Sequence, residues 1–259
     1  MLCKEIIEKL EELYPSNAAL TWDNVGLLVG RKQKEVKNVY VALDLTEEII
    51  DRAIEEKADM IITHHPLIFS PLRTVTDMDF IGRRVVKLLQ NDISYYAMHT
   101  NYDVLRMADL SADILGIDCQ EVLDKTSTEE DKGIGKIGIY ENEMTLRQCS
   151  ELVKKKFGLN AVQVFGAEEK TVRKIAVCAG SGKSVISLAI DKGADVLITG
   201  DIGHHEGIDA VEQGLTIIDA GHYGLEHIFM DFMEGFLKEK LPADIEVVKM
   251  AVKFPAVVV

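Results

Sequence analysis

Six side chains of types that bind metal ions fall in three short stretches of this sequence. They are the adjacent pair His64 and His65, and two pairs four residues apart, His99 with Asp103 and His222 with Glu226. A histidine and a carboxylate four residues apart project from one face of a helix, so each such pair can reach one ion. The chemistry that this set supports is the binding of divalent ions that activate water for hydrolysis.

Each stretch also has a simpler interpretation. A histidine after an apolar strand is often a packed, hydrogen-bonded residue, and a carboxylate near a helix start is favoured by the helix dipole. Adjacent side chains on a regular strand face opposite ways, so His64 and His65 share a site only if the chain turns there. Taken together, the three stretches favour metal binding. The set is larger than one tetrahedral zinc ion needs, which predicts two divalent ions, with zinc, iron, manganese, cobalt and nickel all compatible.

The elements that position these residues are repeated. "VYVALDLTEEIIDRAIEEKADMIIT" (39–63) aligns without a gap with "IAVCAGSGKSVISLAIDKGADVLIT" (175–199) at an offset of 175 − 39 = 136. Each has the strand, helix, strand order that is typical of a parallel sheet. Residues 85–103 and 207–226 form a weaker pair, whose offset of 222 − 99 = 123 superposes the two histidine–carboxylate pairs. We therefore predict an α/β fold of two similar α/β domains from an internal duplication, with mostly parallel sheets and a metal site in the cleft between them.

The polar segment 124–135 is the predicted linker, because it is charged and short of apolar residues. The first domain is then 1–125, with the His-His motif, and the second is 126–259, with the "GHYGLE" motif. The last apolar stretch, "DIEVVKMAVKF", predicts one more strand. Its sheet stays open, and a return to the first domain is one of the alternatives.

The composition is that of a globular protein of one or two domains, since 47% of the 259 residues are hydrophobic and 28% are charged. A formal charge of −14 repels nucleic acid and anionic membranes, so neither is expected as a partner. No apolar run approaches the ~20 residues of a membrane span, and the four cysteines form no C-x-x-C pair. We expect a cytoplasmic protein whose partner is a small-molecule substrate.

Three other patterns are weaker. His204 and His205 in "GDIGHHE" are candidates for proton transfer at the site, or they mark the surface start of a helix. Asp23 and Asn24 are candidates for facing the site, or they cap a turn. The stretch "GSGKS" (180–184) lacks the first glycine of a phosphate-binding loop, so we interpret it as a strand-to-helix turn.

Four stretches together resemble one known family. They are "WDNVGLLVG" (22–30), "ALDLTEEIIDRAIEEKADMIITHHPLIF" (42–69), "HTNYD" (99–103) and "IIDAGHYGLE" (217–226). Over nearly its whole length the chain is similar to the Nif-three-like proteins, the GTP cyclohydrolase I type-two homologues. The resemblance implies two α/β domains, a dinuclear metal centre in the cleft between them and a ring-shaped homohexamer.

The resemblance also implies roles for single residues. By motif, the ligands of the two ions fall on His64, His65, Asp103, His222 and Glu226. His99 then lies beside the ions, where it orients a ligand or a bound water. With His204 and His205 it completes the set of candidate catalytic residues. Independently of the family, the glycines around His222 let the backbone approach an ion closely, which favours His222 over His99 as the direct ligand.

We expect a metal-dependent hydrolase of a small nucleotide-like or phosphorylated substrate, with metal-activated water as the nucleophile. GTP cyclohydrolase-type opening of the purine ring is the reaction that the family label implies. The alternative is a non-catalytic metal-binding, metal-delivery or regulatory protein with the same five ligands. The two differ in whether the metal-loaded protein turns over any nucleotide or phosphoester.

Overall fold

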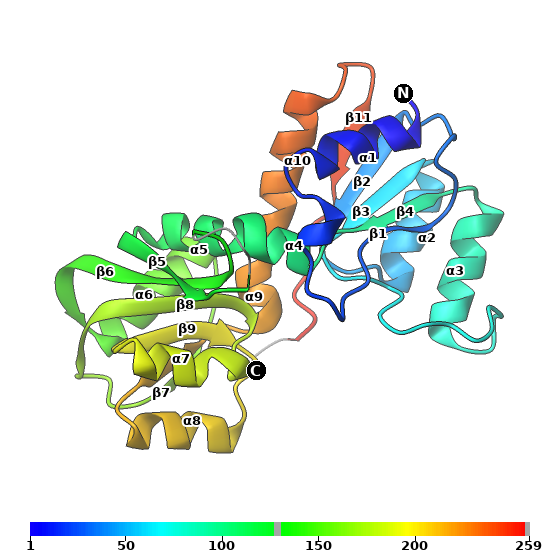
Figure 1. The fold of residues 1–259 in the computed structure, drawn as a ribbon. Helices are drawn as coiled ribbons and strands as arrows, with labels where there is room; N and C mark the ends of the chain where they lie inside the picture. The colour runs from blue at the N-terminus through cyan, green and yellow to red at the C-terminus, as the bar shows by residue number, and fades with distance from the viewer. Residues whose placement is uncertain (127–130, 257–259) are drawn as a thin grey trace. The chain divides into compact units, whose positions relative to one another are not determined.

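Two compact units make up the part of the chain that the computed structural model describes, residues 1–126 and 131–256. Unit 1 consists of residues 1–102 and 229–252, and unit 2 of residues 103–228 together with those from 253 onward. Each unit has its own sheet and its own helices (Figure 1). Unit 1 is thus discontinuous in the sequence.

Unit 1 is built on a five-stranded sheet with the order β1-β4-β3-β2-β11 (Figure 1). Its strands are β1 (Gly26–Val29), β2 (Asn38–Ala42), β3 (Met60–Thr63), β4 (Ser94–Ala97) and β11 (Glu246–Lys249). Strands β11, β2, β3 and β4 pair in parallel, and β1 pairs antiparallel with β4. The carboxyl ends of β2, β3 and β4 therefore meet at one edge of the sheet, where open α/β sheets bind ligands.

Helices cover both faces of this sheet (Figure 1). They are α1 (Cys3–Glu11), η1 (Ser16–Ala18), α2 (Glu47–Glu55), α3 (Phe80–Gln90), α4 (Thr100–Tyr102) and α10 (Ile228–Lys240), whose first residue belongs to unit 2. Successive strand residues point to opposite faces. Tyr95 of β4 therefore joins the core beneath α2 and α3, whereas the hydroxyl of Tyr96 donates a hydrogen bond to Glu11 of α1.

Unit 2 is built on a six-stranded sheet with the order β5-β6-β8-β9-β10-β7. Its strands are β5 (Asp118–Asp124), β6 (Ile134–Thr145), β7 (Gln163–Phe165), β8 (Thr171–Ser181), β9 (Val196–Gly200) and β10 (Thr216–Asp219). Strands β8, β9 and β10 pair in parallel, and the described strands on either side of them pair antiparallel. The predicted α/β fold is confirmed, with antiparallel pairs added around the parallel centre of unit 2.

Helices also lie on both faces of the second sheet. They are η2 (Asp103–Met107), α5 (Ala108–Leu115), α6 (Leu146–Phe157), η3 (Lys183–Val185), α7 (Ile186–Asp191), α8 (His204–Glu212) and α9 (His222–Glu226). Ala176 of β8 joins the core beneath α7 and α8, which contribute Ala189 and Ala210. The next strand residue, Val177, is buried on the opposite face.

The helices are short. The longest in the described ranges, α10, has 13 residues, and a helix of this length spans about 20 Å against the roughly 30 Å of a bilayer core. Among the described residues there is no helix that is both long and apolar enough to cross a membrane.

The two β-α-β units have the same strand register. Val39 of β2 faces Met60 of β3, and Ile175 of β8 faces Val196 of β9. The members of the second pair lie 175 − 39 = 136 and 196 − 60 = 136 residues after those of the first. The first predicted offset is therefore confirmed at the level of strand pairing.

The second offset is wrong by one residue. Ala97 of β4 and Asp219 of β10 occupy equivalent places, since each pairs with the threonine near the end of the neighbouring parallel strand, and 219 − 97 is 122. The extra residue is Gly221, whose φ of +75° glycine adopts without steric cost. His99 therefore precedes α4, whereas His222 begins α9, and the two histidines are not equivalent.

The boundary between the units differs from the predicted one at residue 125. The predicted linker 124–135 overlaps both strands, since Asp124 ends β5 and Ile134 begins β6, and these strands pair antiparallel with Asp124 opposite Ile134. Residues 127–130 of this segment lie outside the described residues. A hairpin connection and a linker share the same polar composition, which is why composition pointed to the wrong boundary. The first of the two segments of unit 1 ends instead at Tyr102.

The C-terminal strand, which the sequence leaves without a sheet, belongs to unit 1. Strand β11 pairs in parallel with β2, with Val247 opposite Val39. Lys249 forms an ion pair with Asp231 of α10. Residues 229–252 thus supply both an edge strand and a helix to the unit that the N-terminal part of the chain begins.

Candidate functional site

His64 and His65 follow β3 in unit 1. The strand ends at Thr63 and the chain bends at once, so the centroids of the two imidazole rings lie 5.0 Å apart. The hydroxyl groups of Thr63 and Tyr95 each donate to the carbonyl oxygen of His65 at 2.8 Å and hold this bend. The turn that a shared site requires is therefore present.

Hydrogen bonds fix the tautomer of both imidazoles. The ring of His64 is fully buried, and its Nδ1 lies 2.8 Å from the carbonyl oxygen of Met98. Because a carbonyl can only accept, Nδ1 carries the proton and Nε2 keeps the lone pair with which a histidine binds metal. His65 is held in the same way, with its Nδ1 2.7 Å from Oδ1 of Asp44.

His99 lies beside this pair. Its ring centroid is 5.5 Å from that of His64 and 5.7 Å from that of His65. Its Nδ1 is 2.9 Å from Oδ1 of Asp23, whose other oxygen accepts hydrogen bonds from the amide and hydroxyl of Thr100. Of the two alternatives for Asp23, the structure shows a residue that both holds His99 and caps the start of α4. The orienting role of His99 stays a prediction.

The Asp23 side chain has no exposed surface. Burial acts to raise the pKa of this carboxyl, but the hydrogen bonds from His99 and Thr100 outweigh burial and lower the pKa to about 2. A carboxyl whose pKa is lower in the folded than in the unfolded protein stabilises the fold above its ordinary pKa of 3.8. This contribution is lost as the pH falls from there towards 2.

We expect Asp23→Asn to lower the free energy of unfolding by about 2 kcal/mol at neutral pH. The difference from the unmodified chain should shrink below pH 4 and vanish only below pH 2, where the carboxyl is protonated in both the folded and the unfolded state. Urea unfolding at a series of pH values measures it, with the exposed Asp244→Asn as control. Equal stability of Asp23→Asn and the unmodified chain at pH 7 would contradict the assignment.

In unit 2, His222 begins α9 and Glu226 ends it. Nε2 of His222 lies 3.0 Å from Oε2 of Glu226, so the common helix face that the spacing predicted is confirmed. The Glu226 carboxylate is only 3% exposed. Nδ1 of His222 lies 2.7 Å from Oδ2 of Asp201, which follows β9.

Two carboxylates surround the His222 imidazole and change its charge. Burial acts to lower the pKa of His222, but hydrogen bonds to Glu226 and Asp201 and their charges outweigh burial and raise it to about 9. When it pairs with these two carboxylates, the imidazole is therefore protonated at neutral pH. A metal ion that binds Nε2 must displace this proton.

Asp103 is the first residue of unit 2 and begins the π-helix η2. Burial, with smaller contributions from the charges of Asp103 and Glu226, raises the pKa of the Cys178 thiol on β8 to about 12. The carboxylates of Asp103 and Glu226 thus lie in one region of unit 2, around β8. A thiol with so high a pKa stays protonated at neutral pH in the metal-free chain.

Gly180 makes room for the Glu226 carboxylate. A Cβ atom at this position would lie 2.4 Å from Oε1 of Glu226 and 3.6 Å from Nε2 of His222, and the φ of +75° also favours glycine. Gly193 has a similar φ of +69°, but a Cβ there would have no neighbour within 4 Å. The two glycines therefore share a left-handed backbone conformation, and only at Gly180 would a Cβ atom clash with the Glu226 carboxylate.

We expect Gly180→Ala to weaken metal binding, because it displaces the carboxylate, and Gly193→Ala to leave metal binding unchanged. Both variants should lose about 1 kcal/mol of stability from the left-handed backbone. Isothermal titration with a divalent metal, together with urea unfolding, separates the two effects. Equal metal affinities in the two variants would show that Gly180 does not serve the site.

The same carboxylate–histidine arrangement occurs in both units. Asp44 with His65, and Asp201 with His222, are each 21 residues apart and each bonded at 2.7 Å. In both pairs the aspartate follows one strand and the histidine follows the adjacent parallel strand. Neither aspartate was among the residues predicted from the sequence, although their equal spacing from a histidine was a signal. Ligating histidines commonly donate their second N–H to such a carboxylate.

His204 and His205 lie in the exposed first turn of α8, with ring centroids 5.2 Å apart. This is the surface helix start that the simpler alternative predicts, and their role in proton transfer stays a prediction. The stretch 180–184 is the strand-to-helix turn that was expected, since β8 ends within it and η3 begins there.

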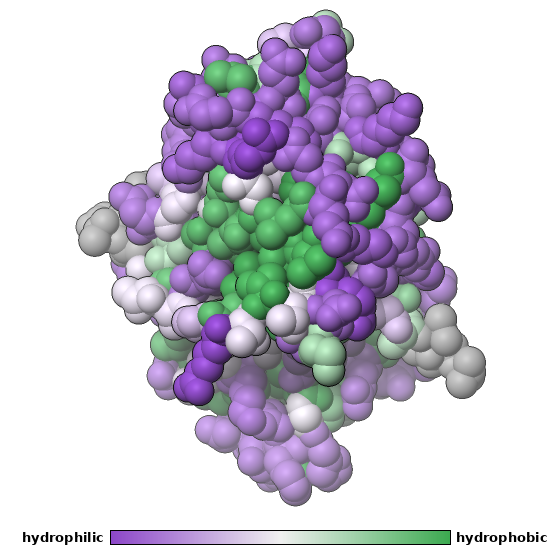
Figure 2. Space-filling view, turned by 90° about the vertical axis from the view of Figure 1, so that its right-hand side faces the viewer, coloured by the Kyte–Doolittle hydropathy of each residue, from purple (hydrophilic) through white to green (hydrophobic). Residues whose placement is uncertain are grey.

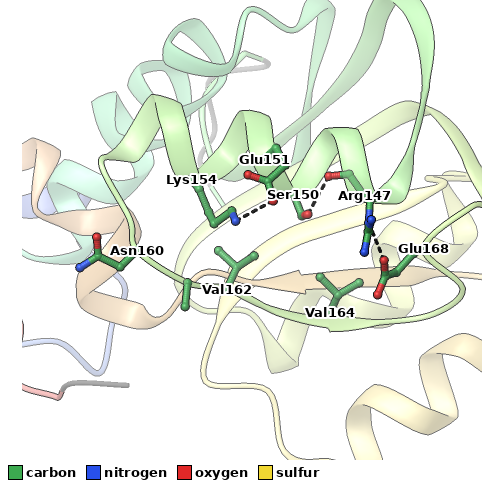
Figure 3. A pocket seen from close by; sticks show the side chains of 9 residues that line it. Arg147, Ser150, Glu151, Lys154, Asn160, Val162, Val164 and Glu168 are labelled. Carbon is green, nitrogen blue, oxygen red and sulfur yellow. Dashed lines mark hydrogen bonds and ion pairs between the residues drawn. The ribbon is translucent and has the colours of Figure 1, made fainter. Parts of the chain in front are cut away.

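A separate pocket of about 580 Å³ lies in unit 2 between α6 and β7 (Figure 3). Ion pairs link Arg147 to Glu168 and Lys154 to Glu151 along its wall, at 2.6 Å each. The predicted site residues are not among the residues that line it. Its charged groups already compensate one another, so we assign it no function.

Fold and site define a class of protein, one with two α/β units in which each unit carries candidate metal ligands at the ends of parallel strands. Among them, His64 and His65 of unit 1 and Glu226 of unit 2 are of the types that hold a metal ion. The family model of Duf34/NIF3 (NGG1p interacting factor 3) matches residues 1–255. The chain belongs to this family, as the resemblance predicted.

Several relatives are similar over almost their whole length. A protein of Clostridium perfringens called GTP cyclohydrolase 1 type 2 homolog is 36% identical over 248 residues, 95% of each chain. One of Methanocaldococcus jannaschii with the same name is 34% identical and covers 96% of this chain and 99% of its own. Among solved structures, a Bacillus cereus protein related to NIF3 gives a TM-score of 0.94 at 29% identity, covering 100% of this chain and 99% of its own. Reduced HcgD from Methanocaldococcus jannaschii gives a TM-score of 0.85 at 33% identity and covers 96% of this chain and 97% of its own.

Proposed function

We propose that this chain is a dinuclear metal-dependent hydrolase of a small nucleotide-like or phosphorylated substrate. The ligands of its two divalent ions are His64, His65, Asp103, His222 and Glu226. The observation that carries the proposal is the set of oxygens 2.7 to 2.8 Å from Nδ1 of all three histidines, which orient the rings as ligating histidines are usually oriented. The names of the relatives from Clostridium and Methanocaldococcus support the reaction class.

The donor set suits divalent ions. Three imidazoles and two carboxylates accept zinc, iron, manganese, cobalt or nickel. His64 and Glu226 are both buried, so the protein already holds these ligands out of bulk water. Bound ions of this kind lower the pKa of water and polarise the bond that it attacks.

The residues around the ligands orient them and handle protons. Asp44 and Asp201 hold the rings of His65 and His222. Because the ionised Asp23 accepts the Nδ1 proton of His99, Nε2 of His99 is the nitrogen that takes up and returns a proton during hydrolysis. GTP cyclohydrolase-type ring opening, in which water adds to the purine, is the particular reaction to test first.

Metal stoichiometry and turnover together test the proposal. Protein loaded with excess of each metal should contain two ions per chain by elemental analysis, and one ion or fewer contradicts a dinuclear centre. The loaded protein is then incubated with GTP, other nucleotides and phosphoesters, and products are separated by chromatography. Metal-dependent turnover supports the hydrolase. Two exchangeable ions without turnover of any substrate would favour a non-catalytic metal-binding, metal-delivery or regulatory protein.

We further propose that the chain forms a closed homo-oligomer, a hexamer, as the family resemblance implies. Figure 2 faces the side on which α3 lies in Figure 1 and shows hydrophobic residues gathered in one area within a hydrophilic surround. The exposed apolar side chains on α3 and just before it include Met78, which is 86% exposed, and Phe80. Apolar areas of this kind mark contact surfaces.

Light scattering at micromolar concentration should therefore give the mass of six chains. Met78→Asp should shift the mass towards smaller species, because it replaces a strongly exposed apolar side chain with a charge, while an exposed change elsewhere, Glu239→Gln, should not. The mass of a single chain for the unmodified protein would refute the proposal.

A further inference from the structure

Trp22 and Phe69 form an exposed aromatic pair on unit 1. Their side chains are 56% and 53% exposed, and their ring centroids lie 5.7 Å apart at an interplanar angle of 46°. The two residues are 69 − 22 = 47 positions apart in the sequence, so the fold brings them together. Two large rings that contact each other and still face water leave apolar surface for a ligand to cover.

Hydrogen bonds hold the chain on both sides of Trp22. They run from Leu20 N to Thr100 Oγ1 (2.9 Å), from Thr100 N to Asp23 Oδ2 (2.9 Å) and from Asn24 Nδ2 to the carbonyl of Ile68 (2.5 Å). The last of these ties the segment of Trp22 to the residue that precedes Phe69. The backbone of the pair is therefore fixed although the rings are exposed, which is the arrangement of a preformed contact surface.

The aromatic pair borders the candidate metal ligands of unit 1. The ring of His99 lies 5.9 Å from that of Trp22 and 6.3 Å from that of Phe69, centroid to centroid. His99 in turn lies within 6 Å of the rings of both His64 and His65. A molecule that stacks on the exposed rings thus lies next to the imidazoles that we assign to hydrolysis.

We infer that Trp22 and Phe69 are a stacking site for a nucleobase, the planar ring of the substrate. The inference rests on the proposed function and names the substrate class of that site. The surface that the pair presents consists of two exposed aromatic rings, so the flat ring of a nucleotide is the part that this surface can bind. Stacking on aromatic side chains binds any base through its flat face.

The chain contains one tryptophan and seven tyrosines, so emission excited at a wavelength that only tryptophan absorbs reports on Trp22 alone. Guanosine monophosphate is titrated into the full-length protein with ribose 5-phosphate as the control that lacks the base. Free N-acetyltryptophanamide, titrated in parallel, corrects for light absorbed by the base. We expect guanosine monophosphate to quench the emission saturably and ribose 5-phosphate to leave it unchanged. Quenching that does not saturate, or that both compounds cause equally, overturns the inference.

Variants of Phe69 test stacking against simple hydrophobic contact. Phe69→Leu keeps an apolar side chain without a ring and should weaken binding about tenfold, whereas Phe69→Tyr keeps the ring and should bind like the unmodified chain. Equal affinity in all three proteins overturns the inference. An emission change that follows protein concentration in the absence of nucleotide also overturns it, because it makes this surface a contact between copies of the chain.

The same titration is carried out with metal removed by chelator and with metal restored. Fluorescence quenching depends on the aromatic pair, and metal content depends on the five ligands. If two ions bind and hydrolysis occurs while the emission of Trp22 does not respond to the nucleotide, only the stacking site is wrong. If the emission responds and Phe69→Leu weakens binding while no ion binds, the stacking site holds and the hydrolase proposal fails.

Discussion

His64→Ala is expected to cost the protein at least one of the two metal ions that we propose it binds. The ring of His64 is fully buried and Met98 holds its Nδ1, so solvent has little access to replace the lost ligand. Changes to groups that only orient ligands weaken metal binding about 10–100-fold, and loss of a ligand should exceed this range. Elemental analysis and isothermal titration of the loaded variant measure the effect.

A second variant separates ligation from packing. Removing a buried ring also leaves a cavity and an unpaired carbonyl, which cost roughly 2–5 kcal/mol. His64→Gln retains most of the volume and a donor for Met98, so it should fold while still binding metal poorly. His204→Ala, at an exposed helix start, should keep both ions. Full metal content and unchanged affinity in folded His64→Gln would remove His64 from the ligand set.

His222→Ala and His99→Ala are expected to differ sharply. Nε2 of His222 lies 3.0 Å from the buried Glu226 carboxylate, and its Nδ1 lies 2.7 Å from Asp201. His222 directly follows Gly221, which has a φ of +75°, and is the first residue of α9. We expect His222→Ala to lose an ion even at saturating metal. His99→Ala should retain both proposed ions and lose activity about 10–100-fold, because the role that we propose for His99 is to orient a bound group and to transfer protons.

Metal content and turnover are measured on the same preparations of both variants. His99→Gln, which keeps a hydrogen-bonding side chain but cannot transfer a proton as an imidazole does, should recover at most part of the activity that His99→Ala loses. A full complement of metal in His222→Ala, or an ion missing from His99→Ala, would reverse the assignment. Of these two residues, His99 would then be the direct metal ligand and His222 the histidine that orients a bound group.

The parallel centre of each sheet was predictable from the sequence. Strands buried on both faces form continuous apolar runs, such as Met60–Thr63 and Val196–Gly200, and the helices before them show the 3.6-residue period. The apolar runs and the helical period are both local properties of the sequence. The gapless alignment of two copies shows each of them twice. His64 and His222 could be placed just after a strand for the same reason, because the end of each apolar run is visible in the local sequence.

The missed features depend on contacts between distant residues. Whether the polar segment 124–135 is a linker or a hairpin connection depends on the partner of β6, which the segment itself does not encode. The single-residue shift at Gly221 is invisible to an alignment that matches His99 with His222, because only strand pairing reveals it. The residues next to Asp44 and Asp201 in the sequence do not distinguish them from other aspartates. Their role depends on hydrogen bonds to His65 and His222, each of which follows the neighbouring parallel strand.

The discontinuity of unit 1 has a consequence for how the chain folds as it leaves the ribosome. Domains usually fold in the order of synthesis, the N-terminal one first. Here the first 102 residues emerge without α10 and without β11, the strand that covers the edge of β2. The continuous stretch 103–228 of unit 2, although made later, has its whole sheet available sooner. A nascent chain therefore has all strands of its second sheet before the first sheet receives its last strand, and the edge of β2 stays open to pairing until residue 249 has been made.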